Sequence, residues 1–251
     1  MARVITVAGK GGVGKTTIAA LIIDYLAGKG VVLAVDADPA ANLNQALGLP
    51  PTESIGNIRE TLDDHIRKGT FSAGVTKMDF LDLRVREALA ESDKIDLLIM
   101  GRPEGPGCYC AVNNILRAIV DKLKNPYDYV VIDCEAGMEH ISRQTTQDVD
   151  NLIIVSDPTL RSLNAAAGIN TLIGDLRSTT GKISLIVNRI QKELPQRAWD
   201  IIKEIRADPV ITIAENPEIY DLEMEGRPVT ELPDDSSLKK GIQELTSALS
   251  I

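Results

Sequence analysis

Apolar runs alternate along the chain with stretches whose hydrophobic residues recur at helical spacing. The runs are short and apolar at nearly every position, a pattern typical of parallel strands that helices cover on both faces. We predict strands at Arg3–Ala8, Val31–Asp36, Ile95–Met100, Asp128–Asp133, Asn151–Ser156 and Lys182–Asn188, with Val210–Ala214 as a short edge strand.

Helical stretches fill the intervals between these strands. Regular alternation of strand and helix predicts right-handed crossovers, and therefore an α/β fold with a doubly wound, mostly parallel sheet. The Gly- and Thr-rich segment Gly69–Phe80 has weak periodicity and is interpreted as a surface excursion within a single domain over residues 1–251. The predicted helices are Thr16–Lys29, Ser54–Lys68, Asp82–Glu91, Ala111–Lys124, Glu139–Val149, Arg161–Ser178, Pro195–Ala207, Pro217–Glu225 and Ser236–Leu249.

Composition narrows the possible classes of function. The 251 residues include 27 Lys and Arg against 36 Asp and Glu, a formal net charge of −9. This acidic balance argues against nucleic acid or an anionic membrane surface as a partner. No stretch approaches the roughly 20 apolar residues of a membrane-spanning helix, and the N-terminus has no signal-peptide layout. Because three cysteines cannot build a disulfide framework, we expect a protein of the reducing cytoplasm.

A glycine-rich loop, GKGGVGKTT at residues 9–17, lies between the first predicted strand and the first predicted helix. Gly9, Gly14, Lys15 and Thr16 fit the phosphate-loop pattern GxxxxGK(S/T). In such a loop backbone N–H groups converge on phosphate oxygens, Lys15 brings a cation to the β- and γ-phosphates, and the Thr16 hydroxyl can bind Mg²⁺. The residues that we expect to contact the nucleotide here are Gly11, Gly12, Val13, Gly14, Lys15, Thr16 and Thr17.

A second lysine, Lys10, lies at the second position of this loop, where a plain phosphate loop needs none. With this lysine the sequence resembles the deviant Walker A ATPases, over nearly the whole chain. Members include the nitrogenase iron protein, the Min and Par positioning ATPases, the arsenite-pump ATPase and metal-centre maturation ATPases. The resemblance implies ATP hydrolysis to ADP, with Lys10 and Lys15 as catalytic residues. It also implies a homodimer in which Lys10 reaches the nucleotide bound by the partner subunit.

Two aspartates end the second predicted strand in the sequence DADP, which alone would be an ordinary polar turn. Asp38 matches the family's first-switch aspartate, and the resemblance implies that it orients or activates the attacking water as a catalytic residue. Asp36 is interpreted either as a support for Mg²⁺ through water or as a partner of nearby backbone groups. Asn42 is assigned only loose contacts to metal or water.

The sequence DCEAG at residues 133–137 follows another strand and resembles the family's second switch, DxxAG. The resemblance implies that Asp133 is the Walker B carboxylate, which holds Mg²⁺ through a water. It also places the N–H of Gly137 near the γ-phosphate, in a loop that moves on hydrolysis.

Asn188 ends the strand KISLIVN. In relatives the matching asparagine binds the adenine edge, so the resemblance implies that Asn188 contacts the base. The guanine-binding motif NKxD is absent here, which favours ATP over GTP.

The segment GRPEGPGCYCAVNN at residues 101–114 contains two of the three cysteines. In an extended segment Cys108 and Cys110 would point to the same side. One chain then offers two thiolates, and a two-fold dimer with this segment near its axis offers four. Four thiolates suit tetrahedral Zn²⁺ or square-planar Ni²⁺. The motif CxC is weak in isolation, where two cysteines that merely pack in a glycine-rich turn are the simpler interpretation.

The CYC turn, together with IDCEAGMEHISR at the second switch, resembles the CooC-type ATPases. These mature the nickel site of carbon monoxide dehydrogenase, and a close relative acts on acetyl-CoA synthase. The resemblance implies that Cys108 and Cys110 of two subunits bind one Ni²⁺ or Zn²⁺ at the dimer interface while ATP is turned over. Cys134 is not our choice of ligand, and His140 is interpreted either as structural or as signalling to the metal.

Two other classes of function stay open. Four thiolates on a dimer could carry a four-iron, four-sulfur cluster, which would make the protein an iron–sulfur carrier or an electron-transfer protein. A positioning ATPase of the Min or Par kind would need a basic, bulky-apolar amphipathic C-terminus. Residues 236–251, SSLKKGIQELTSALSI, have two lysines and no aromatic residue and give that alternative weak support.

Overall fold

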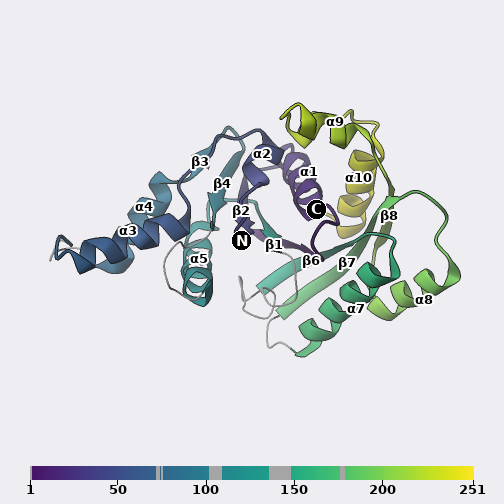
Figure 1. The fold of residues 1–251 in the computed structure, drawn as a ribbon, viewed down its shortest axis with the longest axis horizontal. Helices are drawn as coiled ribbons and strands as arrows, with labels where there is room; N and C mark the ends of the chain where they lie inside the picture. Colours follow the sequence, from purple (N-terminus) through teal and green to yellow (C-terminus); the bar gives the residue numbers. More distant parts are fainter. Residues whose placement is uncertain (1, 72–73, 75, 102–108, 136–147, 176–178) are drawn as a thin grey trace.

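The computed structural model describes residues 2–71, 74, 76–101, 109–135, 148–175 and 179–251. In this part of the chain eight strands form one sheet in the order β3-β4-β2-β5-β1-β6-β7-β8 (Figure 1). Every neighbouring pair is parallel except β3 and β4. The predicted fold class is confirmed, and β8 is an edge strand as predicted. The strands are β1 (Arg3–Gly9), β2 (Val32–Ala37), β3 (Ala90–Glu91), β4 (Ile95–Ile99), β5 (Tyr129–Cys134), β6 (Asp148–Ser156), β7 (Thr179–Ile190) and β8 (Val210–Ala214).

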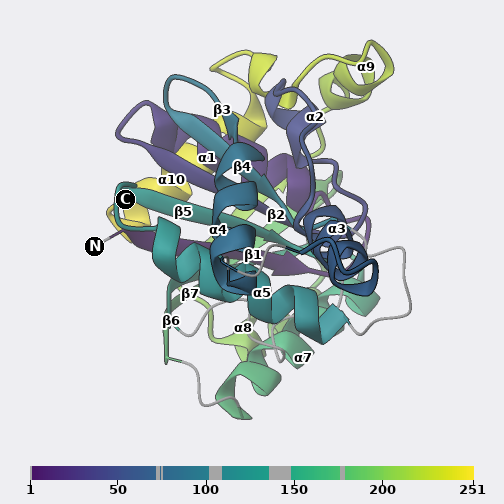
Figure 2. The same cartoon turned by 90° about the vertical axis from the view of Figure 1, so that its left-hand side faces the viewer.

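Helices cover both faces of this sheet (Figures 1 and 2). They are α1 (Lys15–Ala27), α2 (Leu43–Leu47), α3 (Ile55–Arg67), α4 (Lys77–Glu87), α5 (Tyr109–Leu123), α7 (Leu160–Asp175), α8 (Gln196–Ile205), α9 (Glu218–Met224), the 3-10 helix η1 (Val229–Glu231) and α10 (Ser237–Leu249). Helices α1, α2 and α10 share an apolar cluster with η1. On the other face, α3, α4 and α5 pack beside β2, β4 and β5, and α7 and α8 pack beside β6 and β7.

Strand β1 shows why the strands are apolar at nearly every position. Ile5 and Val7 pack into the cluster with α1, whereas Val4 packs into the cluster with α3 and α5. All three side chains are buried. Burying each such side chain contributes about 1.5–3 kcal/mol to the stability of the fold. A polar residue at a position of β1 facing either side of the sheet would lose that contribution.

One predicted helix, Asp82–Glu91, is wrong at both ends. The structure has helix α4 at Lys77–Glu87, so the last residues of the predicted surface excursion Gly69–Phe80 are helical. The helix begins early because the Thr76 side chain accepts a 3.1 Å hydrogen bond from the N–H of Asp79 and caps it. Beyond α4, Ala90–Glu91 pair with β4 as an antiparallel edge strand.

The predicted helix Glu139–Val149 is wrong at its C-terminal end, and residues 139–147 lie outside the described residues. Strand β6 begins at Asp148, which pairs with Thr179 of β7, so pairing with a distant strand decides this boundary. Helix α7 ends at Asp175, and residues 176–178 of the helix predicted there also lie outside the described residues. Helices α2 and η1 are too short to leave a periodic pattern and were not predicted.

The carboxyl ends of the parallel strands meet at one edge of the sheet. The loop 10–14 follows β1, residues 38–42 follow β2, and Asp133 lies near the end of β5. Segments that are more than 100 residues apart in the sequence are therefore neighbours there, at the edge where ligands of such folds bind. None of the described helices has the length and apolar character needed to cross a membrane.

Candidate nucleotide site

The glycine-rich loop between β1 and α1 has a backbone that only glycine adopts readily. Gly14 is left-handed at φ +94°, immediately before the first residue of α1. A Cβ at this position would lie 2.7 Å from Nδ2 of Asn188. A Cβ at Gly9 would overlap the carbonyl oxygen of Val155 in the neighbouring strand β6. The loop is thus held closely against β6 and β7, with the N-terminus of α1 directly behind it.

Lys15, the first residue of α1, is buried within this loop. Its ammonium Nζ donates a 3.4 Å hydrogen bond to the backbone oxygen of Lys10. A buried ammonium group in a glycine-rich loop at the N-terminus of a helix is suited to an anionic ligand, because the helix N-terminus also carries partial positive charge. The side chain of Lys10 is partly exposed at the same loop.

Thr16 and Asp133, predicted to share Mg²⁺, meet in the structure. The Thr16 hydroxyl donates a 2.6 Å hydrogen bond to Oδ2 of Asp133 across 117 positions of sequence. Asp133 is 1% exposed, and within the described part of the chain its Oδ1 has no hydrogen-bond partner. Burial raises the pKa of Asp133 to about 7, against the lowering effect of the hydrogen bond from Thr16.

The hydroxyl oxygen of Thr16 and the carboxylate oxygens of Asp133 fit a bound Mg²⁺. Hard divalent cations prefer hydroxyl and carboxylate oxygens, and the second oxygen of Asp133 is buried without a partner in the described residues. A cation nearby would favour the ionised form of this carboxyl and offset the cost of its burial. The pairing of Thr16 with Asp133 therefore supports the predicted magnesium site.

Asp36, at the end of β2, uses both carboxylate oxygens on backbone groups. Its Oδ1 accepts a 3.0 Å hydrogen bond from the N–H of Asp38, and its Oδ2 accepts a 2.9 Å bond from the N–H of Leu43. Burial raises the pKa of Asp36 to about 6. Of the two roles considered for Asp36, these contacts are those of a backbone partner that shapes the loop between β2 and α2.

The other two residues of this first switch lie in or beside that loop. Asp38 is partly exposed, and its Oδ1 accepts a 2.8 Å hydrogen bond from the N–H of Ala40. Asn42 precedes α2 and lines a cleft of about 920 Å³. Thr16, Thr17, Glu223 and Arg227 also line this cleft. A volume of this size accommodates a nucleotide-sized ligand beside the phosphate loop.

The end of β7 lies against the same loop. Nδ2 of Asn188 donates a 3.0 Å hydrogen bond to the backbone oxygen of Val13. Arg189, which sequence reasoning did not single out, donates from Nη1 to the backbone oxygen of Gly12 at 2.8 Å. A motif search cannot find this arginine, because its contact spans 177 positions and depends on where β7 ends.

Several predicted site residues lie outside the described residues, namely Cys108, Gly137 and His140. Cys110 lies in the first turn of α5, which begins two residues before the predicted helix Ala111–Lys124. The expectation that Cys110 belongs to an extended segment is therefore wrong. Cys134 is buried at the end of β5. Among the described residues, no group of three or more His, Cys, Asp and Glu side chains could hold a metal ion.

Comparison with known proteins agrees with this geometry. Residues 2–187 match the AAA domain family AAA_31. This chain belongs to the MinD/ParA-like P-loop ATPases. The ATPase is 40% identical over 247 residues to an uncharacterized ATP-binding protein of Methanocaldococcus jannaschii, covering 98% of both chains. It is 35% identical over 243 residues to the carbon monoxide dehydrogenase accessory protein CooC of Rhodospirillum rubrum, covering 87% of this chain and 89% of that one.

Solved structures share the fold of this ATPase. The septum site-determining protein MinD of Pyrococcus horikoshii, complexed with Mg-ADP, superposes with a TM-score of 0.68 at 22% identity, covering 98% of this chain and 94% of that chain. A ParA family ATPase from Chlorobium tepidum superposes with a TM-score of 0.70 at 22% identity, covering 99% of this chain and 98% of that one. Membership of this family implies that the ATPase binds and hydrolyses ATP.

Proposed function

We propose that this ATPase is a dimeric nickel metallochaperone that acts in the maturation of carbon monoxide dehydrogenase or acetyl-CoA synthase. The observation that carries the proposal is the CYC sequence at residues 108–110 in a chain that is 35% identical to CooC over most of its length. Ni²⁺ is the cargo in this proposal, with Zn²⁺ as the alternative ion. The work of the ATPase takes place in the reducing cytoplasm.

The position of helix α5 supports a link between the metal segment and the nucleotide. Strand β4 ends at Ile99 beside β2, and α5 begins at Tyr109. The chain therefore leaves β4 at the same edge of the sheet as the first switch, Asp36 to Asn42, before it reaches the two cysteines. In this proposal a change in the first switch on hydrolysis is passed to the two cysteines along this edge of the sheet.

Each residue of the nucleotide site has a role in the proposed reaction. Lys15 and the N–H groups of residues 11–17 bind the phosphates, and Asn188 contacts the adenine base. Asp38 orients the attacking water, and Gly137 contacts the γ-phosphate through its N–H. Thr16 and Asp133 hold Mg²⁺, which neutralises charge on the phosphates when bound. Lys10 reaches the nucleotide of the partner subunit, so hydrolysis depends on the homodimer.

The metal site is completed by symmetry. Cys108 and Cys110 of each subunit supply two thiolates, and a two-fold axis near this segment brings four together. Each thiol releases its proton when it binds the ion, so uptake of nickel lowers the pH of an unbuffered solution.

Helix α10 gives little support to the positioning-ATPase alternative. Its apolar residues Leu238, Ile242 and Leu245 are each at most 1% exposed. They belong to the cluster that α1 and β8 share. This face of the helix is therefore used inside the fold and is not available as the membrane-binding face that such an ATPase would need.

Metal analysis of the purified dimer tests the proposal. We expect one Ni²⁺ per dimer, retained in the control variant Cys134→Ala and lost in Cys108→Ala/Cys110→Ala, which should still bind ADP. Each single variant should lose most of the affinity, because symmetry removes two of four ligands at once. One Ni²⁺ per monomer, or undiminished nickel in the double variant, would overturn the proposal. A broad brown absorption after anaerobic purification would show an iron–sulfur cluster in its place.

A further inference from the structure

Two consecutive residues at the end of β7 hold two consecutive carbonyl groups at the tip of the phosphate loop. Asn188 donates to the oxygen of Val13, and Arg189 donates to the oxygen of Gly12. Asn188 is 4% exposed, and its Oδ1 accepts a 2.9 Å hydrogen bond from the N–H of Arg189. The amide of Asn188 is therefore fixed at both of its ends.

The backbone at this point directs Arg189 toward the loop. Arg189 has φ +58°, in the left-handed region that favours glycine. The pairing of β7 with β8 shifts register between Val187 and Ile190, and irregularities of this kind re-aim side chains at the ends of strands. The exposed guanidinium of Arg189 thus leaves the regular pattern of the strand and contacts Gly12.

Peptide geometry connects these contacts to phosphate binding. In a trans peptide the C=O of one residue and the N–H of the next point in opposite directions. A Gly12 carbonyl held toward Arg189 turns the N–H of Val13 away from β7, and a Val13 carbonyl held toward Asn188 does the same for the N–H of Gly14. Phosphate loops bind anions through such N–H groups, whereas an inward carbonyl would repel them.

We propose that Asn188 and Arg189 form a clamp that orients the N–H groups of Val13 and Gly14, which makes Arg189 a positioning residue for the phosphate chain of the nucleotide. The clamp strengthens binding of any ligand with a diphosphate and does not select the base. This role is separate from contact between Asn188 and adenine, and it does not depend on the nickel function.

Calorimetric titration of the full chain with pyrophosphate, ADP and GDP tests the clamp. The variant is Arg189→Gly, because glycine keeps the left-handed backbone while the side chain is removed. Its matched control is Arg206→Gly, since Arg206 is also an exposed arginine with positive φ, 53°, but lies at the end of α8. We expect Arg189→Gly to lower the affinity for all three ligands by the same factor of roughly ten. Arg206→Gly should leave these affinities unchanged.

Three results would overturn the clamp. Unchanged pyrophosphate affinity in Arg189→Gly would show that the contact with Gly12 does not matter. A loss confined to ADP would show that this region reads the base. The titrations are repeated at about 0.5 M salt, where the screening length falls to roughly 4 Å. A loss that disappears there would show that Arg189 acts as a simple charge near the phosphates, whereas the clamp predicts that the loss persists.

Discussion

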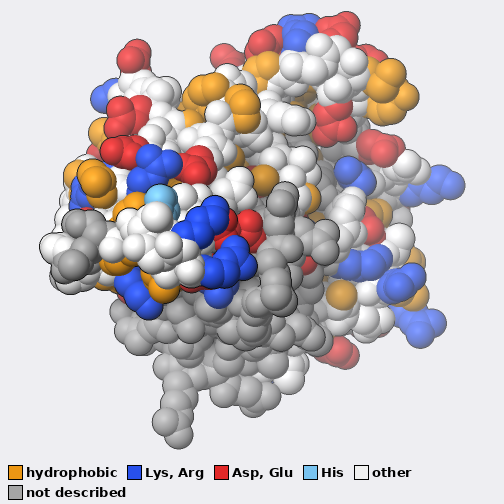
Figure 3. Space-filling view, turned by 60° about the vertical axis from the view of Figure 1, so that its left-hand side comes forward, with side chains coloured by type: hydrophobic (Ala, Val, Ile, Leu, Met, Phe, Trp, Pro, Cys, Tyr) orange, Lys and Arg blue, Asp and Glu red, His pale blue; other side chains and the backbone are white. Residues whose placement is uncertain are grey.

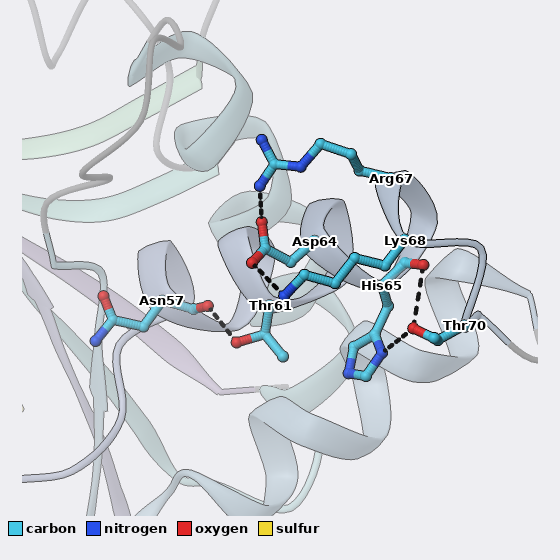
Figure 4. Close-up of polar contacts among 7 residues, drawn as sticks. All are labelled: Asn57, Thr61, Asp64, His65, Arg67, Lys68 and Thr70. Atoms are coloured by element: carbon cyan, nitrogen blue, oxygen red, sulfur yellow. Dashed lines mark hydrogen bonds and ion pairs between the residues drawn. The ribbon is translucent and has the colours of Figure 1, made fainter.

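The nucleotide edge and the outer arm of the molecule differ in how far apart in the sequence many of their polar contacts reach. We define the outer arm as residues 55–71 and 76–87, which include α3 and α4 and project at the left of Figure 1. At the nucleotide edge, hydrogen bonds such as Thr16 to Asp133 and Asn188 to Val13 join residues more than 100 positions apart. On the arm, Asp64 pairs with Arg67 of its own helix and with Lys68, which follows that helix, and His65 contacts Thr70 (Figure 4).

Exposure separates the two regions further. Space filling shows Lys, Arg, Asp and Glu side chains side by side on the surface of the arm (Figure 3). Exposed ion pairs of this sort contribute little to stability, because water and salt screen them. Asp133 and Asn188 are buried, and a buried polar group that loses its partner carries the full cost of desolvation. Substitutions at the edge should therefore change function and stability strongly, and substitutions of the exposed charged residues on the arm should change neither.

The largest expected effect is that of Lys15→Ala. The β-phosphate of ADP loses its cation, so we expect ADP affinity to fall by roughly 100-fold or more. Titration calorimetry measures this, with circular dichroism as the check that the variant is folded. Affinity near that of the wild type would remove Lys15 from the nucleotide site.

Lys10→Ala should separate nucleotide binding from dimerisation. The side chain of Lys10 is partly exposed at the loop, and its proposed target is the nucleotide of the partner subunit. We expect ADP affinity to stay within about threefold of the wild type, while ATP-dependent dimerisation and most hydrolysis are lost. Light scattering in the presence of ATP gives the mass of the variant and therefore shows whether it is a monomer or a dimer. A dimer of Lys10→Ala under ATP would show that Lys10 is only a loop lysine.

The raised pKa values at the edge predict a pH dependence of stability. Burial raises the pKa of Asp36 to about 6 and that of Asp133 to about 7, above the unfolded values near 4. Between the unfolded and the folded pKa of each carboxyl, the folded state binds more protons than the unfolded state. The free energy of unfolding therefore falls as the pH rises from about 4 to about 7. In urea unfolding without nucleotide, the free energy of unfolding of Asp133→Asn should therefore exceed that of the wild type by more at about pH 7.5 than at about pH 5. An equal difference at both pH values would contradict this.

The smallest effect is expected on the arm. Asp64→Asn removes both ion pairs of Figure 4, but the group is exposed, so the melting temperature should change by no more than about 2 °C. ADP affinity should not change. Differential scanning calorimetry and titration measure the two quantities. A loss of nucleotide binding here would mean that the arm and the edge are coupled, and the comparison would fail.

The sequence could predict those features that follow from local patterns. The apolar runs of β1 and β2 were sufficient for the fold class, the loop at residues 9–17 was correctly placed between β1 and α1, and the motif roles of Thr16 and Asp133 predicted that they would meet. It could not predict features that depend on register. Strand β6 begins at Asp148 because β7 pairs with it, and Arg189 reaches Gly12 because β7 is irregular at its end.

The central claim is that nickel joins two subunits through Cys108 and Cys110, and the mass of the protein with nickel but without nucleotide tests it most directly. The ion binds only the assembled four-thiolate site, so it should favour the dimer by mass action. Multi-angle light scattering should give a dimer for the wild type and for Cys134→Ala when Ni²⁺ is present, and a monomer for Cys108→Ala/Cys110→Ala. A wild-type protein that stays monomeric with Ni²⁺, or a double variant that still dimerises with it, would contradict the account.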